Sequence, residues 1–122
     1  MKREIEFRGK TYSDKWVYGY LLKGSIDNDF YILENIGGTP FWIIPETVGQ
    51  YVGIKDKNGN KIFEHDIVKV TVCSSYDCYV CFKDYAWYFV PFDEKVKEVK
   101  FGVLKHAVYE VIGTIFDKES EK

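Results

Sequence analysis

The sequence predicts a mainly β protein (β-rich α+β) that forms a small β barrel or roll. Apolar and polar residues alternate with a period of two, residues typical of tight turns recur at short intervals, and long helical periodicity is scarce. The 122 residues carry a net charge of −2 and are 46% hydrophobic and 18% aromatic. A chain of this length and composition buries a core without disulfides or metals, which excludes a largely disordered protein.

Four strands are expected in the first half of the chain. Alternation over residues 5–8 predicts a strand that Gly9-Lys10 breaks. Residues 16–22, 30–33 and 41–44 predict the next three, and the last is apolar on both faces. One face of the second strand carries large side chains: Trp16, Tyr18, Tyr20 and Leu22. Residues 46–52 predict one helical turn or a further strand, because their flanking glycines disfavour a long helix.

The second half begins with the clearest local signal. Asn58-Gly59 between apolar runs predicts a tight hairpin, since both residues tolerate a positive φ. A strand follows whose valines, Val68, Val70 and Val72, are expected in the core. Further strands are expected over 79–82, 87–92 and 109–116, where Gly113 indicates a bulge or a close backbone crossing. Residues 92–102 are ambiguous, because Val96 and Val99 have the spacing of a short amphipathic helix.

Three separated segments resemble the YopX family of phage and prophage proteins. The first is GQYVGIKDKNGNKIFEHDIV at residues 49–68, and the others are IEFR at 5–8 and EVIGTIF at 110–116. The resemblance implies an SH3-type barrel over residues 50–118 and an N-terminal strand-rich part over 1–49 packed on it. It also implies a phage or prophage origin and no particular activity. The polar residues 119–122 are expected to form a flexible tail.

The segments that carry the resemblance contain the residues expected to define the fold: Gly49, Gln50, Gly53, Asp56, Asn58, Gly59, Glu64, Asp66 and Gly113. His65 departs from the family pattern, which has glycine there. If that position needs a left-handed backbone, histidine tolerates it better than most residues. We therefore expect His65 to be a structural turn residue and not a general base. Asp66 is expected to cap the turn by accepting backbone N–H groups.

The cysteines and histidines are candidates for metal or redox chemistry, and Glu64 and Asp66 could form a metal or catalytic carboxylate pair, although we favour the structural role of Asp66. Cys73, Cys78 and Cys81 have the spacing that opens a plant-type ferredoxin site, but the chain lacks a fourth cysteine. His65 or His106 would have to complete a zinc site. We expect reduced thiols that pack as small hydrophobic residues, with no metal and no cofactor. Without a nucleophile motif or a paired acid and base, we expect no enzymatic activity.

The leading functional hypothesis is a non-catalytic binding or assembly module, an accessory protein that forms homo-oligomers and binds a phage or host protein. Its 10 tyrosines, 9 phenylalanines and 3 tryptophans exceed what a thin core easily hides. The alternative is a nucleic-acid-binding barrel in which Lys55, Lys57 and Lys61 lie beside Tyr51. The charged opening residues and short apolar runs favour the cytoplasm of a bacterial host without membrane insertion.

Overall fold

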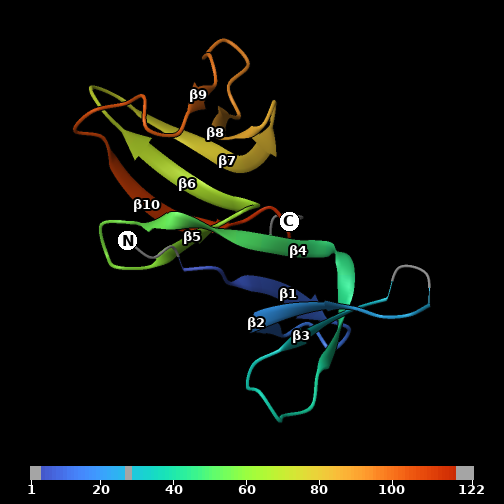
Figure 1. Ribbon diagram of the computed structural model, residues 1–122. Coiled ribbons are helices and arrows are strands. Elements are labelled where there is room, and N and C mark those ends of the chain that lie inside the picture. The colour runs from blue at the N-terminus through green and yellow to red at the C-terminus, as the bar shows by residue number, and fades with distance from the viewer. Residues whose placement is uncertain (1–3, 27–28, 118–122) are drawn as a thin grey trace. The chain divides into compact units, whose positions relative to one another are not determined.

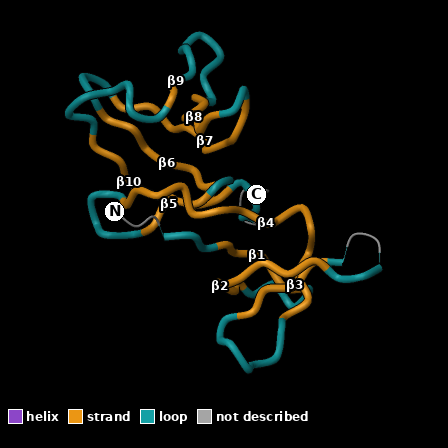
Figure 2. The backbone as a smooth tube through the Cα atoms, in the orientation of Figure 1, coloured by secondary structure: helices purple, strands orange, loops and turns teal. Residues whose placement is uncertain are grey.

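The computed structural model describes residues 4–26 and 29–117, which form strands β1 to β10 and contain no helix (Figures 1 and 2). This result confirms the predicted mainly β class. Within the described residues, no helix is long and apolar enough to cross a membrane. The expected tail at 119–122 lies outside the described residues. The chain divides into two compact units, residues 1–53 and 54–122, and both this boundary and the one expected after residue 49 lie inside the strand Phe41–Lys55.

The N-terminal unit contains β1 (Phe7–Thr11), β2 (Trp16–Lys23), β3 (Phe30–Leu33) and most of β4 (Phe41–Lys55). All pairs are antiparallel. Strand β1 pairs with β2 and β4, and β3 pairs with the same two strands. These pairings close the four strands into a ring. The interior of the ring is apolar: Val17, Ile32 and Ile43 are fully buried, and Phe7, Leu21, Phe30, Phe41 and Val48 pack against them.

Gly9 lies inside β1, so the expected break at Gly9-Lys10 is wrong. A Cβ atom at this position would lie 2.4 Å from Cδ1 of Ile43, which is too close for two carbon atoms. Glycine is therefore required here because any side chain would clash with Ile43, and not because the chain turns. Its missing side chain lets Ile43 fill the centre of the narrow ring.

Residues 46–52 continue β4, and the structure selects the strand over the helical turn. The pairing with β1 is interrupted, because Lys10 lies opposite Ile44 whereas Arg8 lies opposite Gly49. Residues 45–48, which include a proline, bulge between these two points. The hydroxyl of Thr47 accepts a hydrogen bond from the N–H of Lys10 (2.8 Å) and donates one to the carbonyl of Ile44 (2.6 Å). This side chain thus replaces a ladder hydrogen bond that the bulge removes.

The C-terminal unit contains the short β5 (Lys61–Phe63), which pairs with β4, and a five-stranded antiparallel sheet. The sheet has the order β10-β6-β7-β8-β9, as Figure 1 shows. Its strands are β6 (Asp66–Thr71), β7 (Ser75–Lys83), β8 (Ala86–Pro91), β9 (Val99–Lys100) and β10 (Val108–Thr114). The buried core of the unit includes Val68, Val70, Cys78, Val80 and Phe89. The SH3-type barrel stays a prediction for this unit.

Two expectations for the C-terminal unit need correction. Val72 is 47% exposed, because β6 ends at Thr71 and the alternation stops with it. The helical alternative for residues 92–102 is also wrong. Val99 lies in β9, opposite Phe89 of β8, so sheet pairing overrides the helical spacing of the valines.

Candidate binding surfaces

The hairpin that joins β4 to β5 forms at Asn58-Gly59, as predicted. Gly59 has a φ of 84°, and its N–H donates to the carbonyl of Asp56 (3.0 Å). The Asp56 carboxylate accepts hydrogen bonds from the backbone N–H groups of Asn58 (2.9 Å), Asn60 (2.8 Å) and Val111 (2.9 Å). One buried side chain therefore shapes the turn and ties it to β10.

These hydrogen bonds decide the ionisation of Asp56. Burial alone would raise the pKa of the carboxyl group, because it disfavours the charged form. The donors at Val111, Asn60 and Asn58 outweigh this effect and hold the pKa below its ordinary value. Asp56 is therefore charged at neutral pH, and its charge is used inside the fold.

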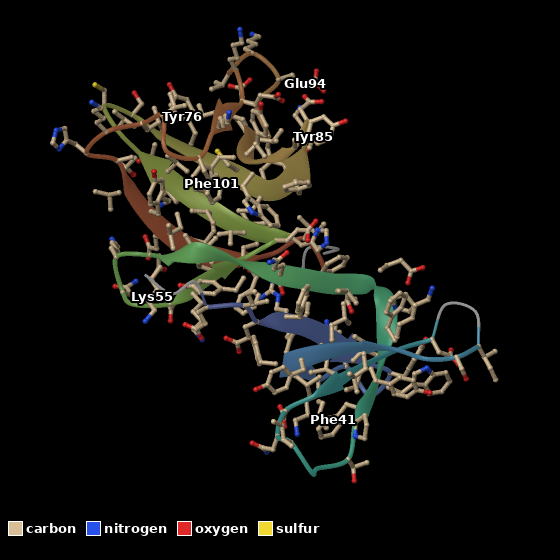
Figure 3. The ribbon with its side chains drawn as sticks, in the orientation of Figure 1. Phe41, Lys55, Tyr76, Tyr85, Glu94 and Phe101 are labelled. Atoms are coloured by element: carbon tan, nitrogen blue, oxygen red, sulfur yellow. The ribbon has the colours of Figure 1, made fainter. Side chains whose placement is uncertain are left out.

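The same hairpin carries the three lysines of the nucleic-acid hypothesis: Lys55, Lys57 and Lys61. Lys55 and Lys57 are exposed, Lys61 is half-buried, and Lys57 lies 3.5 Å from a carboxylate oxygen of Glu110 (Figure 3 labels Lys55). Tyr51 is only 7% exposed. The Tyr51 ring, which the hypothesis uses for base stacking, is therefore almost inaccessible, whereas Lys55 and Lys57 are exposed.

The other residues expected to define the fold have structural positions. Gly49 and Gln50 of β4 lie opposite β1, and Gly53 has a φ of 100°. Gly113 lies at the register shift between β10 and β6, which confirms the predicted bulge. A Cβ atom there would lie 2.7 Å from a carboxylate oxygen of Asp117, so glycine leaves room for that group.

His65 adopts a φ of 80°, which confirms that this position uses a left-handed backbone. Its N–H donates to the carbonyl of Val80 (2.9 Å), and its own carbonyl accepts from the N–H of Ile115 (3.0 Å). The imidazole Nε2 lies 4.0 Å from Glu64 Oε2. Asp66 is buried and accepts the N–H of Phe63 (2.7 Å), as expected of a turn cap. The backbone of His65 thus bonds to β7 and to the residue that follows β10, and the Asp66 carboxylate bonds to β5.

The three cysteines are free thiols in different surroundings: Cys73 is exposed, Cys78 is buried and Cys81 is half-buried. Burial, with a smaller effect of the Asp77 charge, raises the pKa of Cys78 to about 11, so this thiol is neutral at pH 7. Across residues 4–26 and 29–117, no cluster of three or more His, Cys, Asp or Glu side chains has the arrangement of a metal site.

The N-terminal unit carries a second candidate surface, which we call the outer aromatic face: Tyr12, Tyr18, Tyr20, Leu22 and Trp42. The alternation along β2 places Val17 and Leu21 inside the ring and Tyr18, Tyr20 and Leu22 outside it. Cross-strand pairing extends the surface, because Leu22 lies opposite Tyr31 and Tyr31 lies opposite Trp42.

The face continues past the end of β1, since the rings of Tyr12 and Trp42 are 4.7 Å apart. The sequence indicated the large side chains of β2 but not the addition of Tyr12 and Trp42. Only the register between the strands brings these residues beside β2 and β3.

A family model described as YopX protein matches residues 6–120, which covers nearly the whole chain. No curated protein and no solved structure matches the chain.

Proposed function

The chain belongs to the YopX protein family, and from that premise we propose that it is a non-catalytic binding or assembly module of a phage or prophage. In this proposal it acts in the bacterial cytoplasm by associating with a second copy of itself and with other proteins. The observation that supports the proposal is the outer aromatic face. Large apolar side chains gathered on one exposed surface are typical of protein interfaces.

The closed ring of the N-terminal unit favours association through a face. β1 to β4 each pair on both sides within the ring, so edge-to-edge strand addition has little backbone to use. The outward-facing side chains do not contribute to the apolar interior of the ring. Strand β4 illustrates this division, because Phe41 and Ile43 pack inside while Trp42 is exposed.

The size of the face fits a dimer. Its members are 57%, 40%, 54%, 39% and 53% exposed in the order Tyr12, Tyr18, Tyr20, Leu22 and Trp42. With about 150–250 Å² per large side chain, they offer on the order of 500 Å². Two copies of this face bury roughly 1,000 Å², about the smallest area expected of a specific interface.

Two basic side chains of β1 that are themselves buried, Arg8 and Lys10, lie against the ring of Trp16 at the start of β2. The guanidinium of Arg8 lies 4.4 Å from the centre of the Trp16 ring, and the ammonium of Lys10 lies 5.6 Å from it. Lys10 also forms an ion pair with Asp14 at 2.8 Å. The low net charge of −2 adds little repulsion between copies.

Static light scattering at micromolar concentration tests the proposal. We expect a mass above the 14.3 kDa of one chain. Tyr20→Lys places a charge on the face and should return the protein to a monomer. Tyr85→Lys is the matched control, because Tyr85 is 97% exposed at the turn between β7 and β8 (Figure 3). A wild-type monomer, or equal association of both variants and the wild type, would reject the outer aromatic face as the interface.

A further inference from the structure

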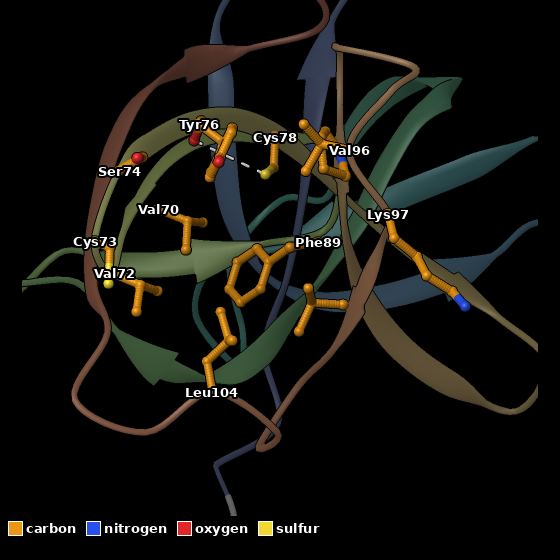
Figure 4. Close-up of a pocket in the computed structure, with 12 residues that line it drawn as sticks. Val70, Val72, Cys73, Ser74, Tyr76, Cys78, Phe89, Val96, Lys97 and Leu104 are labelled. Atoms are coloured by element: carbon orange, nitrogen blue, oxygen red, sulfur yellow. Dashed lines mark hydrogen bonds between the residues drawn. The ribbon is translucent and has the colours of Figure 1, made fainter.

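The C-terminal unit contains an apolar pocket of about 280 Å³. It lies among β6, β7 and β8 and the segments that flank β9 (Figure 4). We call it the C-terminal pocket and define it by its lining residues: Val70, Val72, Cys73, Ser74, Tyr76, Cys78, Phe89, Pro91, Val96, Lys97, Val99 and Leu104. None of these residues belongs to the outer aromatic face, so the pocket is independent of the proposed function.

The chemistry of the lining changes from floor to mouth. Val70, Cys78 and Phe89 are 4%, 3% and 2% exposed, which makes a floor of aliphatic, thiol and aromatic groups. Ser74 and Lys97 are exposed and supply polar groups near the opening. In Figure 4 the ammonium end of Lys97 points away from the other labelled side chains. No carboxylate belongs to the lining.

The absence of charge at the floor selects an uncharged ligand. A charged group would lose its hydration there without gaining a partner of opposite charge. The buried Cys78 thiol remains protonated at pH 7, because burial raises its pKa to about 11. Its hydrogen donates weakly to the carbonyl of Tyr76, at 3.8 Å, so it is directed at the protein backbone.

Phe89 presents a fixed ring to the pocket. It stacks on Phe101, with ring centres 4.2 Å apart and planes inclined by 18°, and on Tyr109, at 5.0 Å and 22°. A ring stacked on two others keeps its orientation, and it offers the pocket its edge, which prefers the face of a further aromatic ring. This arrangement favours an aromatic ligand over a flexible aliphatic one.

Size sets the upper limit on the ligand. An apolar cavity of about 150 Å³ in another protein stays dry and binds benzene. The C-terminal pocket has nearly twice that volume, enough for two fused rings, but it lies below the usual range for drug-sized ligands, about 300–1,000 Å³. We propose that the C-terminal pocket binds a small, uncharged aromatic molecule of one or two fused rings.

Isothermal titration calorimetry with indole tests the proposal on the full chain. We expect one indole per chain, a dissociation constant of about 0.1–1 mM, and a negative heat-capacity change from apolar burial. Leu104→Trp fills the pocket with an indole group of its own and should weaken binding at least about tenfold, a change that calorimetry resolves.

Val103→Trp is the matched control. Val103 precedes Leu104, is 61% exposed and does not line the pocket, so this variant should bind indole like the wild type. A thermal melt checks that each variant folds. If Leu104→Trp does not fold, Val96→Trp supplies a second filling variant from another part of the lining.

Three results would overturn the proposal. The first is a folded wild-type protein that binds no indole at millimolar concentration. The second is a folded filling variant that binds indole as tightly as the Val103→Trp control. The third is binding of N-acetyltryptophanamide at least about tenfold tighter than indole, which would assign the pocket to a side chain of a protein partner. A monomeric mass in light scattering leaves the proposal standing, because the pocket lies within one chain.

Discussion

At position 65 a histidine holds a backbone conformation that most side chains avoid. Its φ of 80° lies in the left-handed region, where glycine has the least steric cost and β-branched residues the greatest. The backbone N–H and carbonyl of His65 both form hydrogen bonds there, so the conformation is held by its neighbours. The side chain packs edge-on against Phe116, at 5.1 Å between ring centres.

We predict that His65→Gly changes the free energy of unfolding by no more than about 1 kcal/mol. Relief of the positive φ is offset by the greater entropy of the unfolded chain and by the lost contact with Phe116. His65→Val should be less stable by about 1–3 kcal/mol, because valine adopts this φ only with strain. Urea unfolding of both variants measures the difference. Equal stability of the two variants would contradict the left-handed backbone at this position.

Asp56 gives a prediction about pH. Its folded pKa is lowered, so its stabilising effect is fully present above the ordinary pKa and is lost as the pH falls through the folded value. Asp56→Asn should reduce the free energy of unfolding by about 2 kcal/mol at pH 7, since it removes a charged acceptor of three backbone hydrogen bonds. The gap between wild type and variant should narrow toward pH 3.

Urea unfolding at pH 7 and pH 3 checks this prediction. Asp93→Asn is the control, because Asp93 is exposed and its carboxylate accepts a solvent-exposed hydrogen bond from the N–H of Lys95. A gap for Asp56→Asn that stays constant over this range of pH would show that the charge of Asp56 does not stabilise the fold.

At the scale of single strands, two valines with the same place in the sequence alternation of β6 differ in burial. Val70 is 4% exposed within β6, whereas Val72 follows the end of the strand and is half-exposed. We predict that Val70→Asp prevents cooperative folding, because it buries a charge without a partner. Val72→Asp should shift stability by less than about 1 kcal/mol. Thermal melts followed by circular dichroism compare them, and a cooperative transition in Val70→Asp would refute the assigned strand face.

The bulge of β4 depends on one hydroxyl group. We predict that Thr47→Val lowers the free energy of unfolding by about 1–3 kcal/mol, because the buried N–H of Lys10 loses its acceptor. Thr47→Ser retains the hydroxyl and should recover most of this loss. Urea unfolding measures both variants. If valine is tolerated as well as serine, the hydroxyl does not support the bulge.

At the scale of the whole molecule, self-association links stability to protein concentration. If only the folded chain associates, mass action raises the thermal midpoint as the concentration increases. We predict that the thermal midpoint of the wild type rises when the protein concentration is increased from about 1 μM to about 100 μM. Tyr20→Lys should remove the dependence. A midpoint that does not change with concentration in the wild type would argue against the proposed assembly.

Local signals predicted the features that depend on a few neighbouring residues. Asn58-Gly59 forms the predicted hairpin, and Asp66 caps the separate turn that precedes β6. His65 adopts the left-handed backbone conformation in that turn. The same kind of reasoning failed at Gly9, where the reason for glycine is an isoleucine on another strand. It also failed at Val99, where pairing with Phe89 decided between helix and strand.

Alternation and turn chemistry act over a few residues, so they predicted the β class and the hairpin at Asn58-Gly59, while the motifs at residues 49–68 and 110–116 indicated the family. The tertiary structure alone decided which large side chains stay exposed. Trp42 lies beside Tyr31 of β3, and Tyr12 lies beside Trp42, because strand register brings them together. Likewise, the C-terminal pocket gathers residues from Val70 to Leu104. Strand register and the closure of the ring depend on packing between distant segments. An alternation with a period of two does not specify which strands pair with each other.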